Sequence, residues 1–355
     1  MAKVLITGNE ALAEAAVRAG CRSYFGYPIT PQNEIPEYLS RRMPQVGGTF
    51  IQAESELAAI SMVYGAAAVG ERAMTSSSSP GISLMQEALS FMAGCELPAV
   101  VVNVQRGGPG LGSISASQAD YFQAVKGGGH GDYKLLVYAP STIQEIADLT
   151  VRAFDKADEY RNPVMILGDG VLGQMMEPVE LPEMSSKKID KPWALRGAKP
   201  GQPGKVIRSL FMLPGEDGIL EQHNYDLKAK YDRMAEREVM VETMHLDDAE
   251  IAVVAFGTAA RIAKSAIAIV REEGIKVGLI RPITLFPFPE KIIAQAAEKI
   301  EQFLVVEMNL GQMVEDVRLA VNGRAPVSFY GRPGGAIPVV EDVAQQIRNA
   351  VRSAK

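Results

Sequence analysis

The chain of 355 residues is poor in the side chains that bind metals and redox centres, with two cysteines and three histidines. Cys21 and Cys95 are far apart in the sequence. An iron–sulfur cluster normally takes four cysteine thiolates, so this chain alone cannot hold one in the usual way. His130, His223 and His245 show none of the spacings that are typical of a zinc site. Any metal or redox centre must therefore lie on another protein.

Long apolar runs and a strong excess of one charge are also missing. The longest apolar runs, such as residues 99–104, are far too short to cross a membrane, and the first residues lack the pattern of a signal peptide. A formal charge of −6 argues against nucleic acid or an anionic membrane as the main partner. We therefore expect a cytoplasmic protein, and its length predicts two domains, or three.

Short apolar segments alternate with helical patterns over the first part of the chain, up to about residue 170. Asn9 is expected to cap the first helix, because its side chain can accept a backbone N–H. The alternation predicts an α/β fold whose parallel sheet has helices on both faces, with ligands at the carboxyl ends of the strands. Strands are expected at 4–6, 23–27, 48–53, 72–76, 99–104 and 163–167, and helices at 10–19, 31–42, 56–69, 80–93 and 141–158.

Residues 177–218 break this alternation, because they are rich in proline and glycine and hold the only tryptophan, Trp193. We expect an extended connector there, laid over the surface or packed on a partner, followed by a charged helix at 221–244. A second α/β unit begins near residue 250. Its strands are expected at 251–256, 277–280, 303–307 and 327–330, and its helices at 259–273, 290–299, 314–321 and 339–354. The predicted domains are 1–176, 177–248 (connector and charged helix) and 249–355.

A glycine pattern at residues 168–173 matches Gly-x-Gly-x-x-Gly and suggests a dinucleotide site, hence a nicotinamide-dependent dehydrogenase. Such a site needs a helix to follow, and Pro178 and Pro182 are incompatible with a sustained one. The same Gly-Asp-Gly resembles the start of a thiamine diphosphate–Mg²⁺ motif. No asparagine stands where that motif would end, around residues 194–200. A tight turn at the end of a strand explains the glycines better.

Two segments combine good helix-capping residues with polar groups that suit a ligand. In 27–31 (Tyr-Pro-Ile-Thr-Pro), Thr30 suits an N-cap and Pro31 the first helical position, while the Thr30 hydroxyl would also face a ligand at a strand's carboxyl end. Glu54 and Glu56 lie between an apolar strand and a helix of small residues. Glu56 either complements the helix dipole or hydrogen-bonds a nitrogen of a ligand.

Three further segments carry chemically useful groups. The hydroxyls of 75–81 (Thr-Ser-Ser-Ser-Ser-Pro-Gly) either cap a turn or hold an anion. Arg106 follows the most apolar strand and precedes a glycine-rich loop, where arginine is a natural carboxylate clamp. His130, in the glycine-rich segment 127–132, is a candidate acid or base.

Taken together, these motifs resemble one family. The chain is similar, over essentially its whole length, to the pyrimidine-domain (alpha-type) subunit of 2-oxoacid:ferredoxin oxidoreductases. Within that family it resembles most the branched-chain, 3-methyl-2-oxobutanoate type, and the 2-oxoglutarate type is the alternative. The matching segments are 8–11 (Gly-Asn-Glu-Ala), 27–31, 54–56, 75–81, 105–110, 127–132 and 307–312 (Glu-Met-Asn-Leu-Gly-Gln).

The resemblance implies a fold and a cofactor. It implies a thiamine-diphosphate pyrimidine-binding domain followed by a domain like the transketolase carboxy-terminal domain. Glu56 would hydrogen-bond the aminopyrimidine ring of thiamine diphosphate and favour its imino tautomer, and Pro28 and Ile29 would also contact the cofactor. Thr30 and Arg106 would bind the carboxylate end of the 2-oxoacid.

The resemblance also implies an activity shared with other subunits. The 2-oxoacid would be oxidatively decarboxylated to acyl-coenzyme A and CO₂, with reduction of ferredoxin. A beta-type subunit would bind the cofactor's pyrophosphate with Mg²⁺ and a [4Fe-4S] cluster, alongside a gamma-type subunit and a ferredoxin-like cluster subunit. The chain would then be inactive alone. The remaining alternative is a non-catalytic scaffold subunit that only recruits partners.

Overall fold

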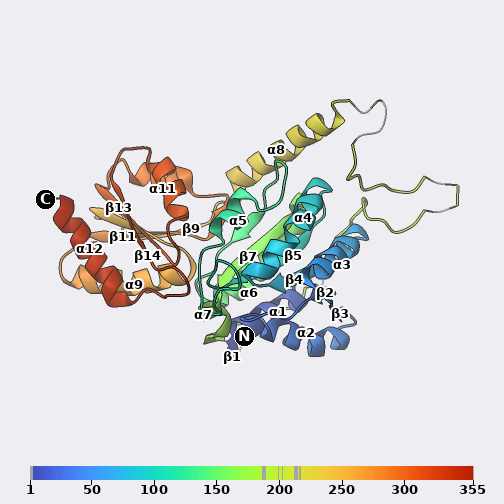
Figure 1. The fold of residues 1–355 in the computed structure, drawn as a ribbon, viewed down its shortest axis with the longest axis horizontal. Helices are drawn as coiled ribbons and strands as arrows, with labels where there is room; N and C mark the ends of the chain where they lie inside the picture. Colours follow the sequence, from blue (N-terminus) through green and yellow to red (C-terminus); the bar gives the residue numbers. More distant parts are fainter. Residues whose placement is uncertain are drawn as a thin grey trace.

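The computed structural model describes residues 3–185, 189–198, 200–201, 203–211, 215 and 217–354. The predicted connector includes residues 186–188, 199, 202, 212–214 and 216, which lie outside the described residues, as do residues 1, 2 and 355 of the predicted terminal domains. Figure 1 shows an elongated molecule with a larger and a smaller α/β unit along its long axis. None of the helices in the described residues is long and apolar enough to span a membrane.

The larger unit is built on a seven-stranded sheet in the order β12-β6-β7-β5-β4-β2-β3. Its strands run parallel except the edge strand β12, which is antiparallel to β6. The predicted parallel α/β sheet is therefore confirmed. The strands are β2 (Ser23–Gly26), β3 (Thr49–Gln52), β4 (Ala73–Ser77), β5 (Ala99–Gln105), β6 (Leu136–Tyr138), β7 (Pro163–Asp169) and β12 (Thr284–Phe286).

Helices cover both faces of this sheet because the central strand β5 is apolar on both sides. Val101 belongs to the core shared with α3 and α4, whereas Val100 and Val102 belong to the core shared with α1, α2 and α6. Burying each such side chain contributes about 1.5–3 kcal/mol. The helices are α1 (Gly8–Arg18), α2 (Glu34–Gln45), α3 (Glu56–Ala68), α4 (Ser79–Gly94), α5 (Tyr121–Lys126), α6 (Ile143–Tyr160) and α7 (Gly170–Gln174).

The smaller unit has a five-stranded sheet in the order β14-β13-β10-β11-β9, with only β9 antiparallel. The four strands predicted after residue 250 are present. The elements are β9 (Val241–Met244), β10 (Ile251–Val254), β11 (Val277–Pro282), β13 (Gln302–Glu307), β14 (Val327–Gly331), α9 (Gly257–Glu272), α10 (Glu290–Ala296), α11 (Met313–Val321) and α12 (Val340–Ala354).

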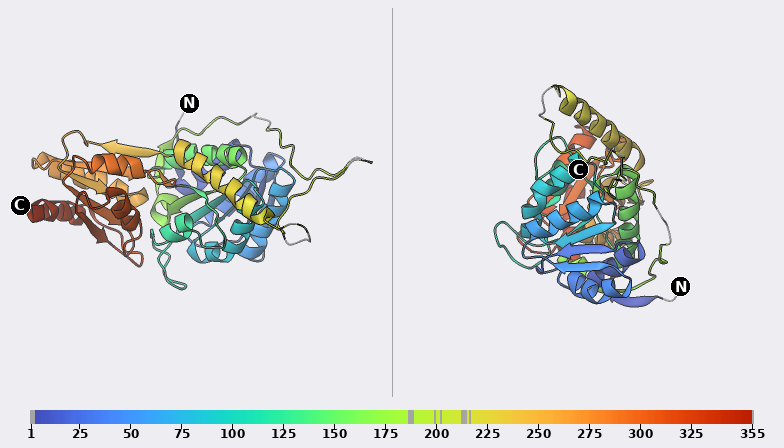
Figure 2. Two further views of the ribbon diagram at one scale, coloured as in Figure 1. Left: turned by 90° about the horizontal axis from the view of Figure 1, so that it is seen from above. Right: turned by 90° about the vertical axis from the view of Figure 1, so that its right-hand side faces the viewer.

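The prediction of a charged helix at 221–244 is wrong about where the helix ends. Helix α8 (Ile219–Arg237) stops before Val241–Met244, which forms β9 on the edge of the second sheet. The residues of β9 are rich in β-branched side chains, which favour a strand. Figure 2 shows α8, in yellow, along the outside of the first unit.

The two units share a strand, an ion pair and part of a hydrophobic core, so they are joined by more than the connector. Strand β12 follows β11 in the sequence but pairs with β6 of the first sheet. Arg281, at 2% side-chain exposure, bonds Glu145 of α6 at 2.5 Å and Glu242 of β9 at 2.5 Å. The core that contains Ile82 of α4 also continues to Phe303 of β13.

The N-terminal strand lies outside the main sheet. β1 (Val4–Thr7) pairs antiparallel with β8 (Met176–Val179), a strand that crosses the predicted start of the connector at residue 177. Asn9 is not the helix cap, because the Thr7 side chain accepts the backbone N–H of Glu10 instead. Asn9 is buried, and its amide donates to the Pro31 carbonyl at 2.9 Å and to Glu34 at 2.7 Å.

Candidate functional site

The predicted site residues follow strands that end at one edge of the parallel sheet. Thr30 follows β2, Glu56 follows β3, the hydroxyl segment 75–81 spans the end of β4, and Arg106 directly follows β5. Because neighbouring parallel strands share a direction, their carboxyl ends meet, and this edge is where such sheets bind ligands.

The segment 27–31 forms a turn rather than the start of a helix. The prediction that Thr30 caps a helix is wrong, because α2 begins at Glu34 and Asn33 stands at the cap position. A buried chain of hydrogen bonds holds this turn. The Gln32 side chain donates to the Tyr27 carbonyl at 3.2 Å and accepts from Ser76 of β4 at 2.6 Å.

Gln32 and Tyr24 were missed in the sequence, although Gln32 directly follows the turn. Both are fully buried, and the Tyr24 hydroxyl bonds Ser76 at 2.7 Å. Buried polar groups need partners, so these side chains fix the turn against the sheet. Thr30 and Ile29 are left half-buried and Pro28 exposed.

Glu56 is buried at 6% exposure, at the first position of α3, while Glu54 is exposed. Ser55 caps this helix by accepting the N–H of Ala58. No group of the described residues donates a hydrogen bond to the Glu56 carboxylate. Helix α4 passes so closely that a Cβ added to Gly81 would lie 2.5 Å from Glu56 Oε1. Gly81 therefore makes the room that the carboxylate occupies.

The hydroxyls of Thr75, Ser77 and Ser78 are buried at the end of β4 and the start of α4. Within the described residues their oxygen atoms have no hydrogen-bond partner. A Cβ on Gly81 would also lie 2.1 Å from Ser77 Oγ, so this hydroxyl and the Glu56 carboxylate border the same glycine. Buried polar groups without partners cost free energy, and a polar ligand would satisfy them.

Arg106 contacts Thr30 directly. Its side chain is 7% exposed, and Nη1 donates to the Thr30 carbonyl at 2.9 Å while Nη2 donates to the Leu111 carbonyl at 3.1 Å. Its Nε is buried without a partner, and no carboxylate of the described residues lies within ion-pair distance. Buried charges in proteins are normally paired, so an anionic ligand would supply the counter-charge that this guanidinium lacks.

Ser79 connects the Glu56 and Arg106 regions. Its Oγ accepts the backbone N–H of Arg106 at 3.1 Å and donates to the Arg106 carbonyl at 3.3 Å. Ser79 belongs to the first turn of α4, the helix whose Gly81 borders Glu56. The Glu56 carboxylate and the Arg106 backbone thus both border the N-terminus of α4.

His130 lies apart from these groups. It is exposed, its Nδ1 is 3.2 Å from Ser90 Oγ, and its ring packs edge-on against Phe91 on α4. None of these contacts involves Thr30, Glu56 or Arg106. The contacts give His130 a packing role on α4.

The glycine pattern at 168–173 spans the end of β7, at Gly168 and Asp169, and the short helix α7 (Gly170–Gln174), in place of the tight turn predicted. The Asp169 side chain caps it by accepting the N–H groups of Val171 and Leu172. Burial raises the pKa of Asp169, and these bonds act in the opposite direction. Because the cap fills the helix N-terminus, the pyrophosphate of a dinucleotide would have no free N–H groups there.

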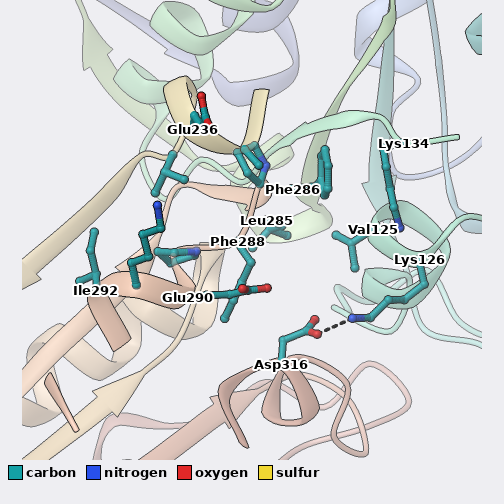
Figure 3. A pocket seen from close by; sticks show the side chains of 15 residues that line it. Val125, Lys126, Lys134, Glu236, Leu285, Phe286, Phe288, Glu290, Ile292 and Asp316 are labelled. Carbon is teal, nitrogen blue, oxygen red and sulfur yellow. Dashed lines mark hydrogen bonds and ion pairs between the residues drawn. The ribbon is translucent and has the colours of Figure 1, made fainter. Parts of the chain in front are cut away.

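A cavity of about 540 Å³ lies between the two units (Figure 3). Lys126 of α5 pairs with Asp316 of α11 across it. Three lysines and three carboxylates line this cavity, so their formal charges cancel and the lining does not select an anion or a cation. None of Thr30, Glu56 and Arg106 lines it.

The described residues contain no cluster of three or more His, Cys, Asp or Glu side chains that could hold a metal ion. Both cysteines are free and buried, and burial raises the pKa of Cys21 to about 12 and that of Cys95 above its usual range. They are therefore poor nucleophiles and poor metal ligands.

Comparison with known proteins defines the class of this chain. Residues 14–243 match the family described as pyruvate flavodoxin/ferredoxin oxidoreductase, thiamine diphosphate-binding, and residues 249–343 match core domain II of pyruvate:ferredoxin oxidoreductase. The chain belongs to the 2-oxoacid:ferredoxin oxidoreductase family, and its first unit is of the thiamine diphosphate-binding type.

Individual relatives cover nearly the whole chain. The ketoisovalerate oxidoreductase subunit VorB of Methanothermobacter thermautotrophicus is 52% identical over 98% of both chains. The 2-oxoglutarate synthase subunit KorA of the same organism is 38% identical over 96% of this chain and 97% of its own.

Solved structures agree with this assignment. The 2-oxoglutarate:ferredoxin oxidoreductase from Magnetococcus marinus, with 2-oxoglutarate, coenzyme A and succinyl-CoA bound, superposes with a TM-score of 0.86 at 26% identity. The match covers 98% of this chain and 65% of that one. A split-gene transketolase shares the fold alone, with a TM-score of 0.61 at 14% identity and 99% coverage of both chains.

Proposed function

We propose that this chain is the pyrimidine-domain subunit of an enzyme that oxidatively decarboxylates a branched-chain 2-oxoacid, 3-methyl-2-oxobutanoate. One 2-oxoacid, one coenzyme A and two oxidised ferredoxins give acyl-coenzyme A, CO₂, one proton and two reduced ferredoxins. The observation that carries the proposal is the buried Arg106 guanidinium, which lacks a carboxylate partner in the described residues. A 2-oxoacid brings such a carboxylate.

The residues around Glu56 fit thiamine diphosphate. Its aminopyrimidine ring carries both donors and acceptors. The site offers a buried carboxylate without a donor, and the neighbouring segment 75–78 offers three buried hydroxyls without partners, of which Ser77 borders the same glycine as Glu56. Bound thiamine diphosphate supplies the carbon nucleophile and the electron sink for decarboxylation. Glu56 would accept a hydrogen bond from a ring nitrogen, and burial makes that bond stronger than it is in water. Pro28 and Ile29 would contact the ring from the neighbouring turn.

Arg106 and Thr30 would hold the substrate. The Thr30 carbonyl orients the guanidinium, and the half-buried Thr30 hydroxyl would donate to an oxygen of the bound 2-oxoacid. A guanidinium pairs with a carboxylate through two parallel hydrogen bonds, which fixes the orientation of the substrate.

The loop after Arg106 supports an apolar substrate side chain. Residues 107–119 contain no charged residue, and Leu111 and Ile114 are 83% and 65% exposed. The second carboxylate of 2-oxoglutarate would need a second cation, which this loop does not provide. The higher identity to VorB than to KorA points the same way.

The other redox components would belong to partner subunits. With two buried cysteines, this chain would leave the [4Fe-4S] clusters to beta-type and ferredoxin-like subunits, and Mg²⁺ with the pyrophosphate to the beta-type subunit. A gamma-type subunit would complete the complex. The nicotinamide alternative loses support because Asp169 fills the helix N-terminus it would need.

The test is an assay of the complete complex, co-purified with its partner subunits, with coenzyme A and methyl viologen as electron acceptor. We expect kcat/KM to be highest for 3-methyl-2-oxobutanoate in a panel with pyruvate and 2-oxoglutarate. A preference for 2-oxoglutarate would favour the alternative substrate. No coenzyme A-dependent reduction with any 2-oxoacid would contradict the proposal and favour a scaffold subunit.

A further inference from the structure

The loop that carries Arg106 is a closed hairpin. Arg106 and Ala116 form an isolated antiparallel bridge. Inside it, the Gly107 N–H donates to the Ser115 carbonyl at 2.8 Å and the Ser113 N–H donates to the Gly107 carbonyl at 2.8 Å. Because the Leu111 carbonyl at its tip accepts from Arg106 Nη2, the hairpin's position determines where the guanidinium points.

The second unit packs against this hairpin. A Cβ on Gly107 would lie 2.9 Å from the Gly334 backbone carbon, and a Cβ on Gly335 would lie 2.6 Å from Ser115 Cβ. Real Cβ atoms do not approach other atoms so closely. Glycine on both sides therefore allows the loop after β14 to touch the hairpin.

The segment that leaves the hairpin, residues 117–122, is tied to the 307–312 motif. Ser117 and Gln118 both donate to the Met308 carbonyl, and the Gln118 side chain accepts the Met308 N–H at 3.1 Å. Asn309 donates to the Gln118 carbonyl at 2.8 Å. Ser117 and Gln118 are fully buried, so these bonds are shielded from water.

Gln312 is the residue of this motif whose side chain bonds only the first unit. Its Nε2 donates to the Ala119 carbonyl at 2.7 Å, and its Oε1 accepts the N–H of Phe122 at 2.8 Å. The buried Glu307 carboxylate accepts the backbone N–H groups of Gln312 and Met313, so Gln312 starts from a fixed backbone.

We propose that Gln312 is a positioning residue for the Arg106 hairpin, so that the second unit sets the affinity of the enzyme for its 2-oxoacid. This inference rests on the proposed function, because it takes Arg106 as the ligand of the substrate carboxylate. Arg106 would hold that carboxylate when the 2-oxoacid binds, before CO₂ leaves. A misplaced hairpin therefore acts on substrate binding, so it raises KM and leaves kcat almost unchanged.

The test uses the assembled complex carrying Gln312→Met, which keeps the side-chain volume and removes both hydrogen bonds. We expect the KM for the 2-oxoacid to rise about tenfold, the order expected from two lost hydrogen bonds, with kcat changed less than about twofold. Gln312→Glu keeps the acceptor for the Phe122 N–H and should give an intermediate KM. If Gln312→Met does not assemble, Gln312→Glu decides, with a KM raised about threefold expected.

Lys126→Met is the matched control, because it removes another contact between the two units, the ion pair of Lys126 on α5 with Asp316 on α11 (Figure 3), and leaves the hydrogen bonds of Gln312 in place. Its KM should stay within about twofold of the wild type. Hydrogen exchange measured by mass spectrometry should be faster over residues 106–119 in Gln312→Met and unchanged there in Lys126→Met. Equal KM values for Gln312→Met and wild type, or equal rises in both variants, would overturn the inference.

Arg106→Ala, measured in the same assay, distinguishes the substrate-binding role of Arg106 from the positioning role of Gln312. If Arg106→Ala raises KM and Gln312→Met does not, only the positioning role fails. If Arg106→Ala leaves KM unchanged, the proposed role of Arg106 in substrate binding fails first.

Discussion

Arg106 offers the sharpest prediction, because its environment is unusual for an arginine. The guanidinium is 7% exposed, its two bonded nitrogens reach only carbonyl oxygens, and its Nε is without a partner. Replacing it with alanine removes the one cation at this edge of the sheet that has no carboxylate partner among the described residues. A bound 2-oxoacid would then place its carboxylate in a buried site without a counter-charge.

The size of the effect follows from two kinds of measurement on other proteins. A hydrogen bond to a charged group contributes about 1.5–3 kcal/mol, and truncating one partner of a buried charge pair costs about 2–5 kcal/mol. We therefore expect Arg106→Ala to lose about 3 kcal/mol, or roughly 100- to 200-fold in kcat/KM, mostly through KM. Arg106→Lys keeps the charge but not the planar fork, so it should lose about tenfold.

The assay is steady-state reduction of methyl viologen by the assembled complex over a range of 2-oxoacid concentrations. Coenzyme A affinity serves as the internal control, because Arg106 is not proposed to contact it. A KM for the 2-oxoacid that is unchanged in a correctly assembled Arg106→Ala complex would refute the reasoning.

Three further predictions test the site and the fold. Gly81→Ala would place a Cβ 2.5 Å from Glu56 Oε1, so turnover should fall about tenfold or more. Gly94→Ala on the same helix is the control, because its Cβ meets nothing within 4 Å and turnover should stay unchanged. Equal turnover in the two variants would contradict this prediction. Arg281→Met removes the buried cation that joins Glu145 to Glu242, although Glu242 keeps its pair with Lys264. Urea unfolding should therefore show a loss of about 2 kcal/mol, and a loss below about 0.5 kcal/mol would be evidence against the pairing. Burial lowers the pKa of Lys230 to about 8, although its partner Glu96 acts in the opposite direction. Below pH 8 the buried charge of the lysine therefore destabilises the fold, and this free-energy cost disappears above pH 10.5. Lys230→Met should therefore be more stable than wild type at pH 7, by about 1 kcal/mol, with a gain that shrinks toward pH 10.5; a constant gain would contradict the assignment.

The large elements were predictable because their patterns are strong. Residues 99–104 are continuously apolar, as a strand buried on both faces must be, and the structure has β5 at Ala99–Gln105. Short or shared elements were not predictable. β12 (Thr284–Phe286) is three residues long and pairs with a strand more than a hundred residues earlier, a contact that no local pattern reveals.

The charged site residues could also be predicted from the sequence, whereas the residues that hold them in place could not. Arg106 and Glu56 stand out as charges next to apolar strands. Gln32, Gln118 and Gln312 are uncharged side chains whose partners come from distant segments, so their importance depends on tertiary contacts. The capping prediction for Asn9 was wrong because its amide bonds Pro31 and Glu34 across the fold. The prediction for Thr30 was wrong because residues 27–31 form a turn and α2 begins only at Glu34.

The central claim is that this chain contributes a buried carboxylate, Glu56, to a thiamine-dependent site shared with partner subunits. The most direct measurement is 2-oxoacid-dependent viologen reduction by the assembled complex carrying Glu56→Gln, with thiamine diphosphate content determined in the same preparation. Glutamine keeps the size of the side chain but loses the charge that favours the reactive tautomer. We predict near-complete loss of turnover, about a thousandfold or more, in a complex that still assembles. Turnover within a few-fold of the wild type would contradict the account.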